Sequence, residues 1–255
     1  MNRTGLAVAL VIAFVVGLVF AVDPRLDLEI SALFFDPTAH KFVGAYRPWM
    51  LRLRDAAEWL IIAIAVLGLV SLAGRLLWPR RRMLMRGRAA VFILLTLALG
   101  PGLLANSILK DHWGRTRPLD VAEFGGAGRF TPWWDPRGAC PANCSFIAGE
   151  PSGAFWTLAP AALTPPQWRL FAYGAALAFG AGIGALRIAA GAHFFSDVAF
   201  AGVLMFLVAW TVHGLLFRWR PTRLTDAAIE DPLARAGEAL RRAARRIAGR
   251  TGQKS

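Results

Sequence analysis

Three side chains that can carry a charge lie together in segment 186–200, between two long apolar stretches. His193 and Asp197 are four residues apart, and Arg187 precedes the histidine by six. Residues four apart lie one turn apart on a helix, so the Asp197 carboxylate can reach a ring nitrogen of His193. Such a carboxylate fixes the tautomer and stabilises the cation that forms when the other nitrogen attacks an electrophile. We therefore expect His193 to be a nucleophile that Asp197 orients.

A second cluster, KDHWGRTRP at 110–118, directly follows an apolar stretch. Lys110 and Arg117 are seven residues apart, so both can point at one ligand if the helix continues. Arg115 lies between them. Taken alone, the cluster is either an anion site or a set of interfacial side chains whose charged ends extend to water.

Small residues mark a third segment, CSFIAGEPSG at 144–153, which leads into another apolar stretch. Small side chains at a helix start, Gly149 among them, let backbone N–H groups approach an anion. Glu150 would lie at the same helix start, where the helix dipole favours a negative charge. Helix capping alone is the simpler interpretation of this segment.

Together the three clusters supply a lysine, two or three arginines, backbone amides, a carboxyl group and an oriented histidine. Arginine forks match phosphate oxygens in pairs, and phosphoryl transfer mainly needs positioning and neutralisation of the peripheral oxygens. The sequence contains no Walker glycine loop and no carboxylate cluster suited to magnesium. We therefore expect phosphoryl transfer through a phosphohistidine at the edge of a membrane, with no metal and no cofactor.

Long apolar stretches must position these clusters. Hydrophobic residues make up 56% of the 255, and about 20 apolar residues in a row can cross a hydrocarbon core. We predict an all-α polytopic membrane domain over 1–217 and a basic cytoplasmic tail over 218–255. The fifth helix is rich in Gly and Ala, which favours a place inside the bundle. Six transmembrane helices are expected at 5–22, 56–78, 89–109, 147–164, 168–187 and 195–217.

The distribution of charge predicts the orientation in the membrane. Loop 75–88 carries six arginines and no acid, and the tail carries ten basic and four acidic residues. By contrast, 23–55 and 110–150 each carry five of each sign. Short cationic loops stay in the cytoplasm, so both termini are expected on that side of a bacterial inner membrane, with the three clusters at the periplasmic end. This placement accounts for the net charge of +13 without a nucleic-acid partner.

The only two cysteines, Cys140 and Cys144, fall in the loop expected in the periplasm. That compartment is oxidising, so we expect a short disulfide between them. A metal site is not expected here, because no second pair or histidine cluster lies nearby.

The tail places four apolar residues at near-helical spacing opposite arginines. This pattern is typical of an amphipathic helix on an anionic membrane surface, although a frayed tail that only fixes the topology fits equally well. The apolar residues are Ile229, Leu233, Leu240 and Ile247.

The spacing of these residues resembles the type-2 phosphatidic acid phosphatase family, which is related to the vanadium haloperoxidases. Its first motif, a lysine followed after six residues by Arg-Pro, is matched in full by Lys110, Arg117 and Pro118. Its third motif is Ser-Arg, five residues, His, three residues, Asp. Leu186 stands where the family often has serine, and the rest of that motif is present. The resemblance covers roughly 89–217, the motif-bearing core.

The resemblance implies roles for the matched residues. The family uses a histidine nucleophile, an aspartate that orients it, and a lysine and two arginines that bind phosphate, without a metal. In this chain the resemblance implies that His193 is the nucleophile and Asp197 the residue that orients it. The implied phosphate ligands are Lys110, Arg117 and Arg187.

The second motif of the family, Pro-Ser-Gly-His, is altered in this chain. One alignment places 147–150 on it and retains a proton donor, Glu150, where the family's histidine protonates the leaving oxygen. The other places 151–154 on it, which keeps Pro-Ser-Gly and loses the acid. We prefer the first, because a carboxyl group can act as general acid when desolvation raises its pKa. Gly149 then contributes to phosphate binding, and Ser145 or Ser152 would have to replace the missing serine.

The resemblance implies a phosphatase whose partners are the bilayer and a phosphorylated lipid in its outer leaflet. Candidates are lipid A, undecaprenyl diphosphate, phosphatidylglycerophosphate and phosphatidic acid, and loop 119–143 is expected to select among them. We favour lipid A, because a second motif with Glu in place of His resembles that of family members that modify the cell envelope. A lipid-to-lipid phosphotransferase and a non-catalytic lipid-binding or transport relative are the alternatives.

Overall fold

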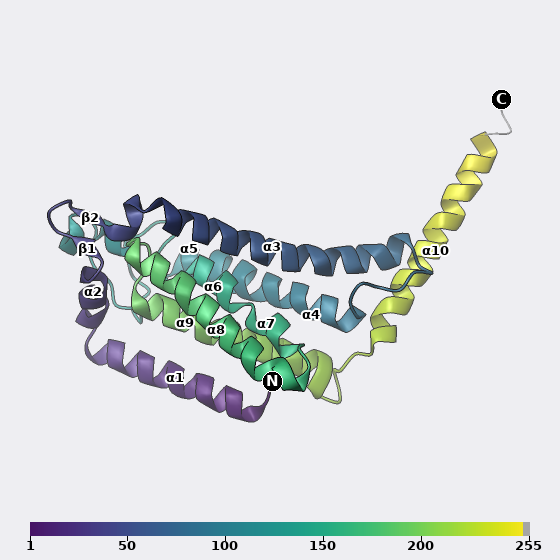
Figure 1. Cartoon of the computed structure of the whole chain (residues 1–255), viewed down its shortest axis with the longest axis horizontal. Helices are drawn as coiled ribbons and strands as arrows, with labels where there is room; N and C mark the ends of the chain where they lie inside the picture. The colour runs from purple at the N-terminus through teal and green to yellow at the C-terminus, as the bar shows by residue number, and fades with distance from the viewer. Residues whose placement is uncertain (252–255) are drawn as a thin grey trace. The chain divides into compact units, whose positions relative to one another are not determined.

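The computed structural model describes residues 1–251, and the regular structure in that range is almost entirely helical (Figure 1). A hairpin of two antiparallel strands, β1 (Phe35–Asp36) and β2 (Lys41–Phe42), is the only sheet in this range. Five helices are long and apolar enough to cross a membrane, so the chain is an all-α polytopic membrane protein, as predicted. They comprise Arg3–Val22, Pro48–Leu77, Gly87–His112, Pro166–Ala189 and Phe195–Arg218.

The N-terminal part of the chain consists of one long apolar helix and a short polar one. Helix α1 (Arg3–Val22) is capped by Asn2, whose side chain accepts a hydrogen bond from the Gly5 N–H at 2.9 Å. Helix α2 (Arg25–Ala32), the hairpin and the 3₁₀-helix η1 (Val43–Tyr46) follow. Helix α3 (Pro48–Leu77) then starts with a proline, whose missing N–H costs nothing in the first turn.

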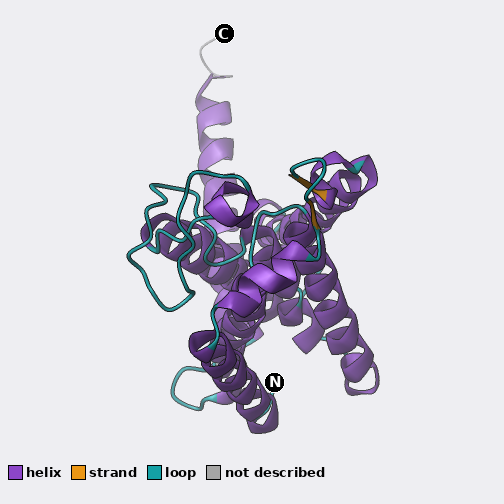
Figure 2. Ribbon diagram, turned by 90° about the vertical axis from the view of Figure 1, so that its left-hand side faces the viewer, coloured by secondary structure: helices purple, strands orange, loops and turns teal. Residues whose placement is uncertain are grey.

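The segment that carries the first motif is a helix of changing pitch followed by a long loop. Helix α4 (Gly87–Leu97) continues into the π-helix η2 (Ala98–Leu109) and the single turn α5 (Lys110–His112). Two 3₁₀ turns, η3 (Pro118–Asp120) and η4 (Ala122–Phe124), interrupt the loop that follows. Figure 2 looks onto the end of the helices where this loop lies. The loop packs against the hairpin in a buried cluster of Phe42, Val121, Phe124 and Phe194.

The predicted fourth transmembrane helix, 147–164, is not one helix. It consists of α6 (Gly149–Phe155) and α7 (Leu158–Ala162), which have seven and five residues. Pro160 lacks the N–H that would donate to Trp156, so a regular helix cannot run through this point. Because this segment is not among the five long apolar helices, the count of six spans is not confirmed.

Helix α8 (Pro166–Ala189) is packed closely by α6, α7 and α9 (Phe195–His213). Figure 1 shows α6 and α7 running along α8. A Cβ at Gly180 would collide with the Phe155 ring of α6, and one at Gly184 would collide with Val198 of α9. Small residues on α8 therefore permit these approaches, as they do in other membrane bundles. The buried cluster beneath the site includes Phe146, Ile147 and Ile188.

The chain divides into two compact units. The first, Met1–Ile62 with Thr96–Thr211, contains every candidate site residue. The second contains Ala63–Leu95 and the chain from Val212 onward, including the π-helix η5 (Gly214–Arg218). The predicted division into a membrane domain ending at 217 and a separate tail stays a prediction.

Most of the tail forms helix α10 (Asp226–Thr251). Two of its carboxylates cap the start of α4, where backbone N–H groups lack helical partners. Asp226 accepts the Arg88 N–H at 3.1 Å, and Glu230 accepts the Gly87 N–H at 2.9 Å. Binding of α10 to a membrane surface remains a prediction, and the side chain of Ile247 lies outside the described residues.

Candidate active site

His193 lies in the turn between α8 and α9 and is fully buried. Its Nδ1 lies 2.8 Å from the carbonyl oxygen of Ser145. A carbonyl can only accept, so Nδ1 carries the hydrogen and Nε2 keeps its lone pair. Nε2 has no hydrogen-bond partner among the described residues. Gly191 makes this turn possible, because its φ is +68° and a Cβ there would collide with the Phe42 ring.

Asp197 does not make the predicted hydrogen bond to His193 in the described structure. Helix α9 begins only at Phe195, so His193 lies outside it and the expected spacing of one helical turn does not apply. The buried Asp197 carboxylate instead accepts hydrogen bonds from Ser145 Oγ at 2.5 Å, from the Phe194 N–H at 2.9 Å and from Arg115. Asp197 therefore acts on His193 only indirectly, by fixing the residue whose carbonyl holds the ring.

Arg115 is the centre of a buried ionic cluster that joins distant parts of the chain. Its guanidinium binds Asp197 and, at 2.7 Å, Asp27 of α2. It also donates to Ser196 Oγ at 2.8 Å and to the Thr131 carbonyl at 2.9 Å. The two carboxylates raise the pKa of Arg115 although burial opposes this, and burial raises the pKa of Asp27. A buried charge is tolerated only with such complete pairing.

Lys110, Glu150 and Arg187 meet near the imidazole. One Glu150 carboxylate oxygen lies 3.4 Å from Arg187 Nε and 3.9 Å from His193 Nε2. Lys110 and Glu150 both line a cavity of about 290 Å³, whose wall also includes Asn106. Helix α3 supplies one face of the cavity with Arg54, Ala57, Glu58 and Ile61.

Gly149 lies close to two polar side chains of the preceding helix. A Cβ there would lie 2.9 Å from Asn106 Oδ1 and 3.2 Å from Lys110 Nζ. The same helix start brings Glu150 to the cavity, whereas the hydroxyl of the buried Ser152 donates to the Ala148 carbonyl at 2.7 Å. This geometry supports the alignment that places Glu150, rather than 151–154, at the acid position.

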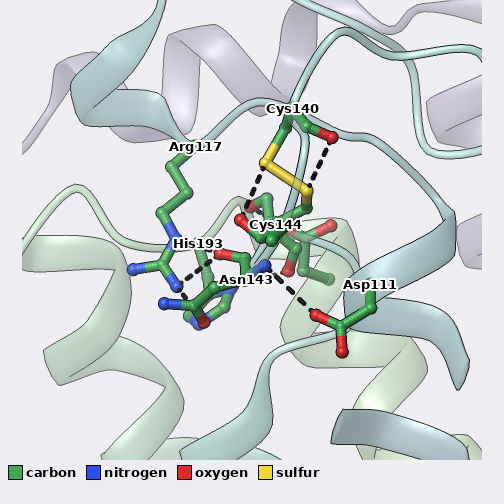
Figure 3. Close-up of a disulfide and its surroundings, with 9 residues drawn as sticks. Asp111, Arg117, Cys140, Asn143, Cys144 and His193 are labelled. Carbon is green, nitrogen blue, oxygen red and sulfur yellow. Dashed lines mark hydrogen bonds between the residues drawn. A yellow bond between two sulfur atoms is a disulfide. The ribbon is translucent and has the colours of Figure 1, made fainter. Parts of the chain in front are cut away.

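Arg117 lies at the edge of the site next to the disulfide (Figure 3). Cys140 and Cys144 are bonded to each other. Arg117 Nε and Nη2 donate to the Asn143 carbonyl at 3.1 and 2.7 Å, and Nη2 also donates to Asn143 Oδ1 at 2.8 Å. The five-residue loop 140–144 thus touches a predicted phosphate ligand.

The electrostatics of the site differ from the sequence expectation. Burial alone raises the pKa of Glu150, but the Arg187 guanidinium and a backbone hydrogen bond lower it, and its net pKa lies well below the usual range. Burial lowers the pKa of His193, although Glu150 opposes this effect. Glu150 is therefore ionised and His193 neutral at pH 7, which suits the predicted nucleophile but not the predicted acid.

The sequence interpretation missed Asp27, Ser196, Asn106 and Asn143. None belongs to a spaced motif, and Asp27 is 88 residues from its partner Arg115. Of these four, Asn106 could have been predicted from the sequence. It lies one turn before Lys110 in an apolar helix, and a polar side chain in such a stretch often marks function. In the described range, no group of three or more His, Cys, Asp or Glu side chains could hold a metal ion.

The buried histidine has a free nitrogen and lies near cations and a carboxylate, an arrangement that can bind a phosphate group between apolar helices. The chain belongs to the PAP2 superfamily, whose family model matches residues 89–223. It is accordingly a membrane phosphatase that hydrolyses lipid phosphates, as the motifs predicted.

Three curated proteins illustrate the similarity. The chain is 35% identical over 219 residues to a lipid A 4′-phosphatase of Francisella tularensis subsp. novicida (strain U112), which covers 86% of this chain and 98% of that protein. It is 40% identical over 103 residues to a lipid A 4′-phosphatase of Rhizobium leguminosarum, covering 40% of this chain and 44% of that protein. A Rhizobium etli protein of the same name is 40% identical over 102 residues, 40% of each chain. No solved structure matches this chain significantly.

Proposed function

We propose that the chain removes a phosphate group, the 4′-phosphate, from lipid A at the periplasmic face of a bacterial inner membrane. The observation that carries the proposal is His193, a buried neutral imidazole whose free Nε2 points toward Glu150 beside Arg187. The names of the relatives support the choice of lipid, and the charge bias of the loops supports the orientation.

Substrate binding begins with an exchange of anions. The Glu150 carboxylate lies beside Arg187 and His193, where a phosphoryl group must come to react. The phosphate would displace it and bind Lys110, Arg187 and Arg117, whose charges neutralise the peripheral oxygens. Once the dianion takes over Arg187, Glu150 loses that stabilising charge and gains a repulsive one, and its pKa rises.

The chemical step forms and breaks one bond each. His193 Nε2 attacks phosphorus, the N–P bond forms, and the bond between phosphorus and the sugar oxygen breaks. Glu150, protonated in the presence of the dianion, donates its proton to the leaving oxygen. The Ser145 carbonyl, which accepts from Nδ1–H, stabilises the ring as it becomes positive.

Hydrolysis of the intermediate returns the enzyme to its first state. Glu150, now ionised, accepts a proton from water, and the hydroxide attacks phosphorus as the N–P bond breaks. Inorganic phosphate leaves and His193 becomes neutral again. Lys110 and Arg187 would hold the phosphoryl oxygens through both steps, so the two transition states use one set of charges.

The purified protein should be tested on lipid A, undecaprenyl diphosphate, phosphatidylglycerophosphate and phosphatidic acid, each with EDTA present. We expect lipid A to release phosphate faster than the other three lipids and to lose it from the 4′ position. Vanadate should inhibit this reaction. Faster turnover of another lipid would overturn the substrate, and loss of activity in EDTA with recovery in magnesium would overturn the mechanism. Phosphate that appears on a second lipid would identify a phosphotransferase. A protein that acts on none of the four lipids would be a non-catalytic relative.

A further inference from the structure

Arg117 is held by one edge of its guanidinium and free at the other. Its Nε donates to the Asn143 carbonyl oxygen, and its Nη2 donates to both that oxygen and Asn143 Oδ1. None of the contacts described for Arg117 involves Nη1. Figure 3 shows the two side chains pointing toward one another. An arginine fixed on one edge keeps the other edge available for a phosphate oxygen.

Asn143 is itself fixed by an unusual backbone conformation. Its φ is +53°, in the left-handed region that asparagine tolerates better than most residues. Its N–H donates to Asp111 Oδ1 at 3.2 Å. The disulfide between Cys140 and Cys144 closes the loop around it.

The loop 140–144 is also bonded to the segment that carries Lys110. The Cys140 N–H donates to the Gly114 carbonyl at 3.0 Å, and the Cys144 N–H donates to the Lys110 carbonyl at 2.9 Å. The loop therefore lies across the turn between the two phosphate ligands of the first motif.

We propose that Asn143 is a positioning residue for Arg117, and that the disulfide-closed loop 140–144 is the frame that holds it. The inference rests on the proposed function, because it takes Arg117 as a phosphate ligand. An unrestrained arginine side chain loses rotamer freedom when a ligand fixes it. Holding the side chain before the phosphate arrives removes much of this loss from binding.

The first test compares Asn143→Gly with the wild type. Glycine accepts the left-handed backbone and keeps the carbonyl contact, so only the Oδ1 contact is lost. We expect the inhibition constant for orthovanadate and the KM for the lipid to rise about tenfold, with kcat and the unfolding temperature nearly unchanged. Asn143→Asp, which retains an acceptor oxygen, should lie closer to the wild type. Asp135→Asn, which breaks the surface pair with Arg137 in the same loop, is the matched control and should change nothing.

A double-mutant cycle shows whether Asn143 acts through Arg117. Arg117→Lys removes the fork, so adding Asn143→Gly to it should have little further effect on the vanadate constant. Fully additive effects would overturn the proposal, as would an Asn143→Gly variant with wild-type or tighter vanadate binding. If the wild type hydrolyses no lipid phosphate, the proposed function fails instead, and vanadate binding measured directly still tests the positioning role.

The frame is tested by removing the disulfide. The variant Cys140→Ser with Cys144→Ser should weaken vanadate binding in the same direction as Asn143→Gly. In this double-serine background, Asn143→Gly should weaken vanadate binding less than it does in the wild type. The reason is that the loop no longer holds Asn143 Oδ1 in place for Arg117. Unchanged vanadate binding in the cysteine variant would overturn the role of the disulfide and leave that of Asn143.

Discussion

The Glu150 carboxylate lies where an anion would bind in the site. It lies between Arg187 Nε at 3.4 Å and His193 Nε2 at 3.9 Å, and the Arg187 charge lowers its pKa. The carboxylate therefore satisfies charges that would otherwise be buried and unpaired, and it must move when phosphate enters. Under the proposed mechanism one residue fills the site, donates the proton and later accepts one.

Replacing Glu150 by glutamine tests its role as an acid. The amide keeps the size of the side chain and cannot donate a proton in the reaction, so cleavage of a poor alkoxide leaving group should slow by about 10²–10⁴-fold. A p-nitrophenyl phosphate ester needs little protonation and should slow far less. The measurement is kcat for both substrates with purified Glu150→Gln.

His193→Ala is the control for this comparison. It should abolish turnover of both substrates, because no covalent intermediate can form. Equal slowing of both substrates by Glu150→Gln would contradict the acid role and leave Glu150 as a structural charge. His112 or water would then be the next candidate for the proton source.

The charge state of His193 can be measured directly. Burial lowers its pKa below the ordinary value of 6.5, so the ring should still be neutral at pH 6.5 and take up a proton only at lower pH. In ¹⁵N-histidine spectra we expect the Nδ1-protonated tautomer at neutral pH, assigned by comparison with His193→Gln. Because the Glu150 carboxylate raises this pKa, Glu150→Gln should lower it further. A ring that is charged at pH 7 would contradict the assignment.

At this scale the sequence predicted the motif residues and missed the residues that hold them. Lys110, Glu150 and Arg187 meet as the spacing indicated, because each lies at the end of a helix on the same side of the bundle. The prediction that Asp197 bonds directly to His193 was wrong. Residues four apart lie one turn apart only when both are in a helix, and His193 lies before α9 begins. Asp27 had no sequence signal, because contacts between residues far apart leave no local pattern.

Helix α6 is short, and its position determines where Glu150 points. Its Phe155 ring fills the space left by Gly180 on α8. A seven-residue helix has little stability of its own, so packing against α8 must hold it. A change on α8 should therefore alter the position of the Glu150 carboxylate, although Glu150 lies in a different helix.

Gly180→Ala and Gly182→Ala form a matched pair that tests this packing. Each replacement should gain about 1 kcal/mol of helix propensity. A Cβ at Gly182 has no neighbour within 4 Å, whereas one at Gly180 would collide with Phe155. We expect Gly182→Ala to unfold at the same or a higher temperature, and Gly180→Ala to unfold at a lower temperature with reduced kcat. Equal behaviour of the two variants would contradict the dependence of α6 on α8.

Helices were predictable where apolar residues run without interruption. The predicted spans 5–22 and 168–187 fall within α1 and α8, while α3 starts earlier than 56 because its first turns are polar. The segment 147–164 looked continuous by composition alone. Its break depends on the hydrogen-bond geometry around Pro160, which composition does not describe.

At the scale of the whole molecule, the number of membrane crossings depends on α6 and α7. Five long helices would leave the two termini on opposite sides of the membrane. The termini lie on the same side only if α6 and α7, which are two short helices, together form a sixth crossing. We predict that they do cross, because loop 75–88 and the tail are both strongly basic. Fluorescent protein fused to either terminus should therefore fold in the cytoplasm.

A reporter inserted after the exposed Arg137 completes the topology test. Alkaline phosphatase, which is active only in the periplasm, should be active there and inactive when fused to the C-terminus. Activity at the C-terminus would show that 147–164 does not cross, and inactivity after Arg137 would reverse the whole orientation.

The bond between Arg115 and two aspartates has a consequence for how the protein is made. Asp27 leaves the ribosome first, Arg115 follows, and Asp197 emerges only when most of the chain has been synthesised. Until then the nascent chain holds an arginine and an aspartate without their third partner, at a position that becomes fully buried. Ser145, whose carbonyl holds the His193 ring, is fixed by that last aspartate. The enzyme would thus become competent only after its ninth helix has been inserted, and no truncated translation product would carry the activity.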